Sequence, residues 1–117
     1  MTAPDSVAAQ IEFADGSCGQ LVYSAEGDAG YPKEILTVYG TGVVAESINF
    51  QELIVHCGRK EKSFSYTSKG HAEEMAAWAK FLEGRTPPPL PYEESRVSMR
   101  LTFALLESIQ QGRSIDL

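Results

Sequence analysis

The tripeptide Lys69, Gly70 and His71 has the clearest potential for chemistry, because it stands at the start of an amphipathic segment. Residues 71–83 have apolar side chains at helical spacing, which places the tripeptide at the amino end of a predicted helix. Backbone N–H groups and the helix dipole favour anions at such an end, so a substrate carboxylate or phosphate is a candidate ligand. The structural alternative is that Gly70 serves as a cap and His71 as a residue of the first turn.

The other reactive side chains are better explained by structure than by catalysis. His56 lies within a predicted strand with no acidic residue two positions away, which favours a paired histidine over a general base. Cys18 and Cys57 lack the spacing of a zinc site, so we expect small buried side chains, with a disulfide between them as the alternative. Since no Ser/His/Asp or Cys/His combination can be assembled, we predict no catalytic residue and no metal site.

The segment from Glu26 to Pro32 is the best candidate for a ligand-contacting loop. It is long for a hairpin connection and contains Gly27, Asp28, Gly30 and Tyr31, which are typical of loops that approach a ligand. The alternative is an ordinary surface loop.

The first two thirds of the chain have the alternation of strands. Alternating apolar residues separated by turn residues predict about six strands. Their ranges are 6–13, 18–24, 33–40, 43–50, 53–58 and 63–67. Turns are expected at Asp15-Gly16, at 40–42 and in the charged segment 59–62. The short connections favour antiparallel pairing.

The last third changes to helical periodicity. Residues 71–83 place Met75, Trp78, Ala79 and Leu82 on one face, and Gly84 ends this helix. A second helix is predicted from about 93 to 111, with Gly112 at its end. Its apolar stripe consists of Val97, Leu101, Ala104, Leu105 and Ile109. Residues 86–91 form a proline-rich spacer, and 114–117 can add a short terminal strand.

Helices that follow a run of strands predict an α+β fold, and we expect a single domain over residues 1–117. The expected architecture is a two-layer sandwich, in which an open, mostly antiparallel sheet of about six strands carries both helices on one face. The central strands are apolar on both sides, with Leu36 and Val38 opposite Ile35 and Tyr39. Two helices cannot cover both faces, so we expect another copy of the chain or another domain on the second face.

A monomer is the alternative to this partner surface. Four polar residues, Gln10, Glu12, Glu46 and His56, would then keep the second face sufficiently polar for exposure to water.

Composition narrows the classes of partner. The 117 residues are 43% hydrophobic and 22% charged, which is typical of a globular domain, and the net charge of −6 comes without a basic stripe. Nucleic-acid binding is therefore not expected. No apolar run reaches the roughly 20 residues of a membrane span, and residues 1–10 lack the features of a leader. We expect a cytoplasmic protein with no membrane contact.

Four segments in order carry a family resemblance: SVAAQIEFADGSCGQLVYSAEG, KEILTVYG, KGHAEEMAAWAKFLEG and ESIQQGRSIDL. From about Asp5 to Leu117 the chain resembles the C-terminal domain of the Gfo/Idh/MocA oxidoreductases, named for glucose-fructose oxidoreductase and inositol dehydrogenase. In that family a Rossmann domain holds NAD(P), and a sheet domain of this type shapes the substrate pocket and often packs sheet to sheet in oligomers. The resemblance implies an NAD(P)-dependent parent enzyme acting on a sugar, polyol or related hydroxy compound.

The chain departs from the family in what it lacks. No predicted strand leads into a G-x-G-x-x-G turn, so we expect no cofactor in this chain and a separate Rossmann domain as partner. The family's Glu-Lys-Pro motif is absent, and the nearest segment, Pro32-Lys33-Glu34, has another order. The resemblance places the 26–32 loop toward the nicotinamide side, which makes Tyr31 and Lys33 candidate substrate contacts, and we add His71 from the helix start.

Two interpretations follow. The chain is either the substrate and oligomerisation half of an oxidoreductase, inactive alone, or a free-standing ligand-binding or interaction module derived from such a domain.

Overall fold

The computed structural model describes residues 5–117, and the chain divides into two compact units. The first unit combines the chain up to Gly27 with Leu90–Leu117, and the second is Asp28–Pro89. Residues 1–4, which begin the segment inspected for a leader, lie outside the described part. The single domain over residues 1–117 stays a prediction.

The first unit contains a hairpin and a helix. Strands β1 (Ser6–Glu12) and β2 (Cys18–Ser24) pair antiparallel, from Ser6 opposite Ser24 to Glu12 opposite Cys18. The Asp15 carboxylate accepts hydrogen bonds from the backbone N–H and hydroxyl of Ser17, at 2.9 and 2.7 Å. These bonds lower the pKa of Asp15. The predicted Asp-Gly turn is confirmed, and its cause is local.

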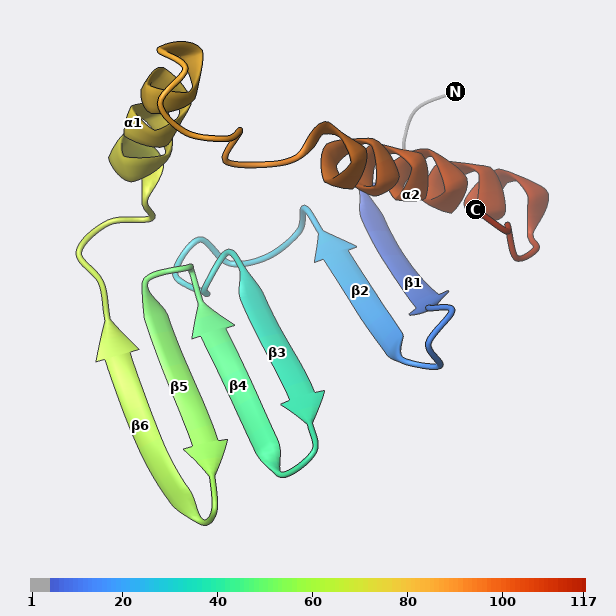
Figure 1. The fold of residues 1–117 in the computed structure, drawn as a ribbon. Coiled ribbons are helices and arrows are strands. Elements are labelled where there is room, and N and C mark those ends of the chain that lie inside the picture. Colours follow the sequence, from blue (N-terminus) through green and yellow to red (C-terminus); the bar gives the residue numbers. More distant parts are fainter. Residues whose placement is uncertain (1–4) are drawn as a thin grey trace. The chain divides into compact units, whose positions relative to one another are not determined.

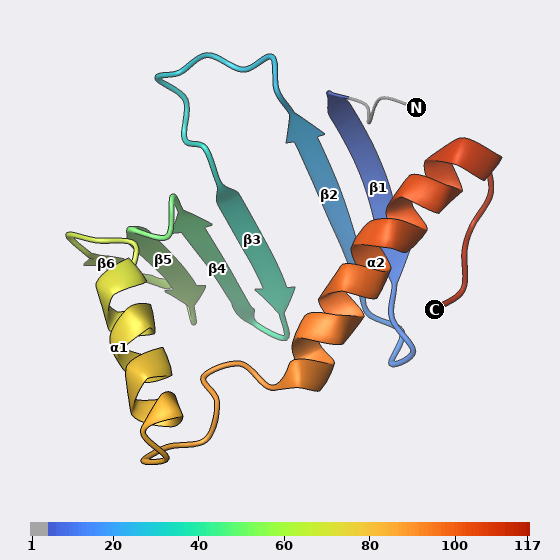
Figure 2. The same ribbon diagram turned by 90° about the horizontal axis from the view of Figure 1, so that it is seen from above.

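Helix α2 (Tyr92–Gln111) lies over one face of this hairpin (Figure 2). On β1 the residues Val7, Ala9 and Ile11 are half-buried, while the residues between them are exposed, as the alternation predicts. Ala104 of α2 is buried, with 9% of its surface exposed. Leu101 and Leu105 are half-buried as expected. At the ends of the predicted stripe, Val97 and Ile109 are 52% and 46% exposed, and Ile109 lines the same groove as Leu101, Ala104 and Leu105.

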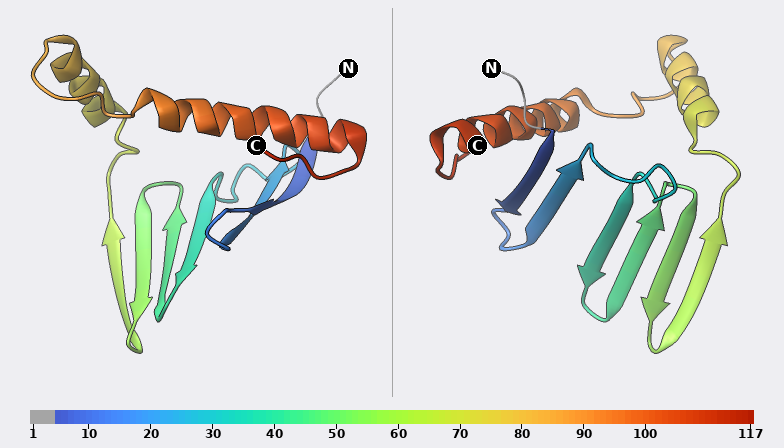
Figure 3. Two further views of the ribbon diagram at one scale, coloured as in Figure 1. Left: turned by 45° about the vertical axis from the view of Figure 1, so that its right-hand side comes forward. Right: turned by 180° about the vertical axis from the view of Figure 1, so that it is seen from behind.

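The second unit is a four-stranded antiparallel meander followed by a helix (Figure 1; Figure 3, right). Its elements are β3 (Ile35–Gly40), β4 (Val43–Ile48), β5 (Glu52–Cys57), β6 (Lys60–Ser65) and α1 (His71–Leu82). Two residues, Gly58 and Arg59, connect β5 to β6, both with positive φ. The charged turn expected at 59–62 is therefore wrong, since Lys60 and Lys62 belong to β6, an edge strand, where lysine is well tolerated.

Within residues 5–117 the α+β class with antiparallel strands is confirmed, and so is the number of six strands. The strands pair in two sheets, β1-β2 and β3-β4-β5-β6, instead of the single sheet that we expected. The sandwich with both helices on one face of a sheet stays a prediction. Among the residues that the structure describes, neither helix is long and apolar enough to cross a membrane.

Two smaller expectations are wrong. Residues 114–117 form no strand, because the chain reverses at Gly112, which has φ 62°, and the Ser108 hydroxyl donates to the carbonyl of Arg113 at 2.7 Å. Cys18 and Cys57 are free and exposed instead of buried. They are the first residue of β2 and the last of β5, so they lie at sheet margins, where few neighbours cover a side chain.

Helix α1 confirms the predicted range to within one residue, and Gly84 follows it with φ 71°. None of its residues is buried. In the predicted apolar stripe, Met75 and Leu82 are 60% and 81% exposed. The apolar stripe of α1 is present, and its packing on a face of the sheet stays a prediction.

The register of the meander separates two faces of different chemistry. The more apolar face, called the apolar face below, carries Leu36, Val38, Val43, Ala45, Leu53, Val55, Cys57 and Phe64, together with the polar residues Ser47, Lys60 and Lys62. The mixed face carries the apolar residues Ile35, Tyr39, Val44, Ile48 and Ile54 among Thr37, Glu46, Glu52, His56, Glu61, Ser63 and Ser65. The expectation that the central strands are apolar on both sides is confirmed, and Glu46 shares a face with His56 as expected.

Candidate functional site

A polar cluster joins the segment before β3 to the start of α1, both in the second unit. The Nζ of Lys69 lies 2.5 Å from Oε2 of Glu34, and both side chains are partly exposed. Lys33 precedes Glu34 in the chain, His71 follows Lys69 by two residues, and the positive charges of both act on this carboxylate more weakly than Lys69 does. We call Lys33, Glu34, Asn49, Lys69 and His71 the Glu34 cluster.

Asn49 fixes the backbone of this cluster. Its side-chain Oδ1 accepts hydrogen bonds from the backbone N–H of Lys33 at 2.8 Å and of Glu34 at 3.3 Å. Its own N–H donates to the Glu34 carbonyl at 2.7 Å. Asn49 has φ 52°, a left-handed conformation that Asn adopts more readily than most residues. The turn after β4 thus holds the segment that presents Lys33 and Glu34.

The charge of Glu34 is stabilised where it lies. The hydrogen bond from Lys69 is the main cause that lowers the pKa of Glu34 below its ordinary value of 4.5. The positive charges of Lys69, Lys33 and His71 act in the same direction, and burial opposes them. Glu34 is therefore an ionised acceptor that positions Lys69 and is unsuited to act as a proton donor at neutral pH.

The helix start is shaped by glycine. Gly70 precedes α1 with φ 85°, and a Cβ added there meets no atom within 4 Å. The backbone conformation, and not a lack of space, requires glycine at this position. No side chain caps the first turn of α1. Gly70 is therefore the N-cap residue, as expected, but it acts through its backbone conformation and not through a side-chain hydrogen bond. His71 is the first residue of the helix, also as expected.

Tyr31 stands in a turn two residues before Lys33. Its backbone N–H donates to the Asp28 carbonyl at 3.0 Å, and the Asp28 carboxylate accepts from Gly30 N–H at 2.7 Å. The ring of Tyr31 is 69% exposed. Of the three predicted substrate residues, Lys33 and His71 thus gather at Glu34, and Tyr31 lies beside the cluster in sequence.

The cluster has chemistry suited to binding polar molecules. Lys33 and Lys69 supply N–H donors, the Glu34 carboxylate supplies an acceptor, and the imidazole of His71 can do either. Paired donors and acceptors at a partly exposed site recognise hydroxyl groups well. Lys69 belongs to the tripeptide that the sequence marked as a candidate anion site, but Glu34 was not predicted as a site residue, although the charged residues of Pro-Lys-Glu before a strand were a usable signal.

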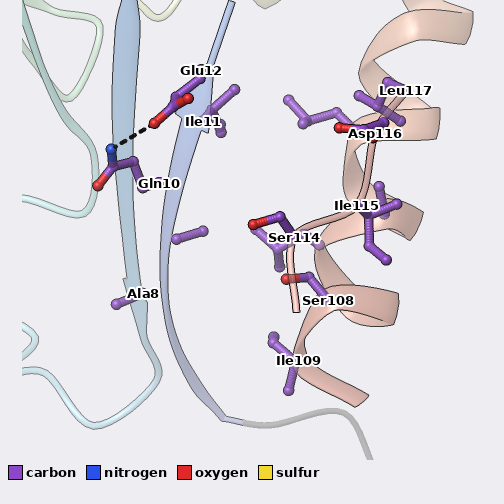
Figure 4. Close-up of a pocket in the computed structure, with 14 residues that line it drawn as sticks. Ala8, Gln10, Ile11, Glu12, Ser108, Ile109, Ser114, Ile115, Asp116 and Leu117 are labelled. Carbon is purple, nitrogen blue, oxygen red and sulfur yellow. Dashed lines mark hydrogen bonds between the residues drawn. The ribbon is translucent and has the colours of Figure 1, made fainter. Parts of the chain in front are cut away.

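A groove in the first unit is a second candidate (Figure 4). It has a volume of about 640 Å³ and lies between β1, α2 and the tail 114–117. Apolar side chains such as Ile11, Leu101 and Ile115 line it together with five polar residues, which are Gln10, Glu12, Ser108, Ser114 and Asp116. The Ser108 hydroxyl in its wall already donates to a carbonyl. The Gln10 amide also donates to the Glu12 carboxylate, at 3.4 Å, so three of the five polar side chains already have a hydrogen-bond partner and the groove is a weaker candidate for a polar substrate than the Glu34 cluster.

His56 has an acidic neighbour that sequence spacing did not reveal. Its Nδ1 lies 3.8 Å from Oε2 of Glu61, which is its direct partner on β6. Both side chains are exposed, as expected for a paired histidine on a sheet face. Within residues 5–117, no three His, Cys, Asp or Glu side chains come together as a metal site.

Comparison with family models, with curated proteins and with solved structures finds no match to this chain.

The first testable prediction concerns the Glu34–Lys69 pair. Because the pKa of folded Glu34 lies below 4.5, its ionised form adds stability above that pH, and this contribution is lost as the pH falls through the lowered value. We expect Glu34→Gln to lower the melting temperature slightly at pH 7 and to match the wild type well below pH 4.5. Thermal unfolding across pH measures this.

The control for this measurement is Glu26→Gln, which removes a carboxylate outside the cluster. A melting-temperature difference between Glu34→Gln and the wild type that stays constant down to the acid limit would show that the pair has no such role.

Proposed function

We propose that this chain is the substrate-pocket and oligomerisation domain of an NAD(P)-dependent oxidoreductase acting on a sugar, polyol or related hydroxy compound. The observation that carries the proposal is the ordered resemblance of four segments, which occupy the β1-β2 hairpin, the start and length of β3, helix α1 and the end of α2. The Glu34 cluster supports it, since two residues predicted to contact substrate, Lys33 and His71, flank the Glu34–Lys69 ion pair in the chain.

The described residues do not fit a dinucleotide. A pyrophosphate group needs a glycine-rich turn between a strand and a helix, with free N–H groups at the helix start. The connection from β6 to α1 contains one glycine, Gly70, and the first turn of α1 carries Glu73 and Glu74. Helix α2 follows Pro91 and has Glu93 and Glu94 in its first turn. In this proposal the nicotinamide cofactor therefore belongs to a separate Rossmann domain.

The proposed work of this chain is to bind and orient the substrate. Lys33 and His71 would donate hydrogen bonds to substrate hydroxyl or carbonyl oxygens, and the Tyr31 ring would supply an apolar surface beside them. Glu34 would keep the Lys69 ammonium in place. NAD(P), bound on the other domain, would supply the redox chemistry, and the residues of this chain would bind and orient the substrate.

We also propose that the mixed face of the meander is the oligomer interface. It combines five apolar side chains with polar ones, a composition usual for interfaces between separately folded chains. Two of its acidic residues already have neighbours: Glu46 accepts from the Thr37 hydroxyl at 3.4 Å, and Glu61 lies beside His56. The helices of the predicted sandwich would then pack on the apolar face. A cytoplasmic location is also part of this proposal.

The second testable prediction concerns ligands. Titration of the isotope-labelled chain with millimolar inositol or glucose should shift the NMR amide signals of Tyr31, Lys33 and 69–71, because the hydroxyl groups of the probe would replace water at the Glu34 cluster. The double variant Lys33→Ala/His71→Ala should lose these shifts, and Lys62→Ala, on β6, should keep them. NAD and NADP should give no binding by calorimetry.

Micromolar affinity for NAD or NADP would contradict this domain assignment. Absence of shifts with both polyhydroxy probes, combined with no NAD binding, would favour the alternative of a protein-interaction module. The mass of the native polypeptide separates the two further, because a two-domain enzyme of about 350 residues has a mass near 40 kDa.

A further inference from the structure

Helix α2 has a second apolar stripe that the sequence prediction did not include. We call Tyr92, Met99, Phe103 and Leu106 the outer stripe. Three of these side chains are largely exposed: Tyr92 by 75%, Met99 by 53% and Phe103 by 62%. At 100° per residue, the outer stripe lies on the side of the helix opposite Leu101, Ala104 and Ser108, which line the groove toward β1. A helix that is apolar on two opposite sides needs two packing partners.

The spacing of the outer stripe is that of a helix pair. Positions 92, 96, 99, 103, 106 and 110 alternate steps of four and three residues, the heptad pattern by which two helices pack along one seam. Arg96 and Gln110 occupy the outer positions of this seam, and the apolar residues Met99, Phe103 and Leu106 occupy its middle. Arg96 is held on its own helix by Glu93, at 2.7 Å. The apolar centre fits another helix of similar length.

We propose that the outer stripe pairs antiparallel with the same helix of a second copy of this chain. Charge supports this occupant. Arg100 and Glu107 occupy equivalent positions beside the seam, one heptad apart. In the antiparallel register that packs Phe103 against Leu106 of the second copy, Arg100 of each copy faces Glu107 of the other, which forms two symmetric ion pairs.

The competing arrangements are less favourable. A shift by one heptad brings Arg100 against Arg100 and Glu93 against Glu107, so like charges meet. A parallel pair places Arg96 against Arg96 within the seam. It also turns the charged residues of one helix toward Ser95, Thr102 and Ile109 of the other, which carry no charge, so no ion pairs form across the seam. The charges on α2 thus select one self-complementary arrangement, and a self-complementary surface is what a two-fold symmetric pair requires.

The test is a charge swap in the full chain, in a Tyr39→Glu background so that the mixed face does not contribute. The variants Arg100→Glu and Glu107→Arg each create two like-charge contacts in a homotypic pair, so each alone should have a dissociation constant raised at least tenfold over the background. A mixture of the two variants restores both ion pairs and should associate at least as tightly as the background. Sedimentation velocity measures all three samples, and circular dichroism checks that helix content is unchanged.

Several results would overturn the proposal. They are a background protein that stays monomeric at high concentration, single variants that associate like the background, and a mixture that stays dissociated. Phe103→Glu provides a second route to the same answer, because it removes the apolar centre of the seam without altering Arg100 or Glu107. Failure here leaves the proposed function intact, since the substrate cluster and the mixed face lie on other elements.

Discussion

Replacement of Tyr39 by glutamate should abolish association through the mixed face, leaving only the pairing through α2, while the chain stays folded. Tyr39 lies on the mixed face of β3 and is 78% exposed, so the change removes no contact in the core of the chain. Tyrosine is a frequent anchor of protein interfaces, and loss of such an anchor costs about 2 kcal/mol or more, roughly a 30-fold weaker association. Glutamate adds an unpaired charge to a desolvated surface, so we expect at least this loss at the mixed face.

The neighbouring residue provides a matched control. Val38 lies next to Tyr39 on the same strand but on the apolar face, where the predicted sandwich places the helices. Val38→Glu should therefore lower the melting temperature and leave association at the mixed face unchanged. Sedimentation equilibrium and thermal unfolding of both variants separate these effects. Dissociation by Val38→Glu together with an unaffected Tyr39→Glu would place the interface on the apolar face and refute the proposed one.

The elements that the sequence predicted well have local causes. The β1-β2 hairpin was predicted to within one residue, because its alternation is regular and the Asp15 carboxylate stabilises the turn from within three residues. Both helices ended at the expected glycines, Gly84 and Gly112, since positive φ at a helix end favours glycine in any context. Strand β6 was placed three residues too late, because its charged residues resemble a turn.

The features that could not be predicted depend on register or on distant segments. Glu34 and Lys69 are 35 residues apart, so their ion pair follows only from the path of the whole meander. The acidic neighbour of His56 is on the next strand, and only the register of β5 with β6 reveals Glu61 as that residue. The exposure of Cys57 depends likewise on its position at the end of β5. For α2 the sequence does contain a second apolar stripe, Tyr92, Met99, Phe103 and Leu106, beside the one that the prediction used.

Asn49→Ala should destabilise the second unit by about 2–3 kcal/mol, from two separate losses. Removal of Oδ1 leaves the N–H groups of Lys33 and Glu34 without their acceptor, and each net hydrogen bond is worth about 1 kcal/mol. Alanine at φ 52° adds strain of about 1 kcal/mol, partly relieved by local adjustment. The same variant should weaken the polyol-induced NMR shifts, because Asn49 holds the backbone that presents Lys33.

Two further substitutions separate the losses. Asn49→Gly removes the acceptor but tolerates positive φ, and Asn49→Asp keeps an acceptor at the same reach. We therefore expect stability to fall in the order wild type, Asn49→Asp, Asn49→Gly, Asn49→Ala, measured by urea unfolding. An alanine variant within about 0.5 kcal/mol of the wild type, the range of an ordinary surface substitution, would mean that the turn does not hold the cluster. The position of the Lys33-Glu34 segment would then depend on the Glu34–Lys69 ion pair alone, and Lys69→Met should abolish the polyol-induced NMR shifts.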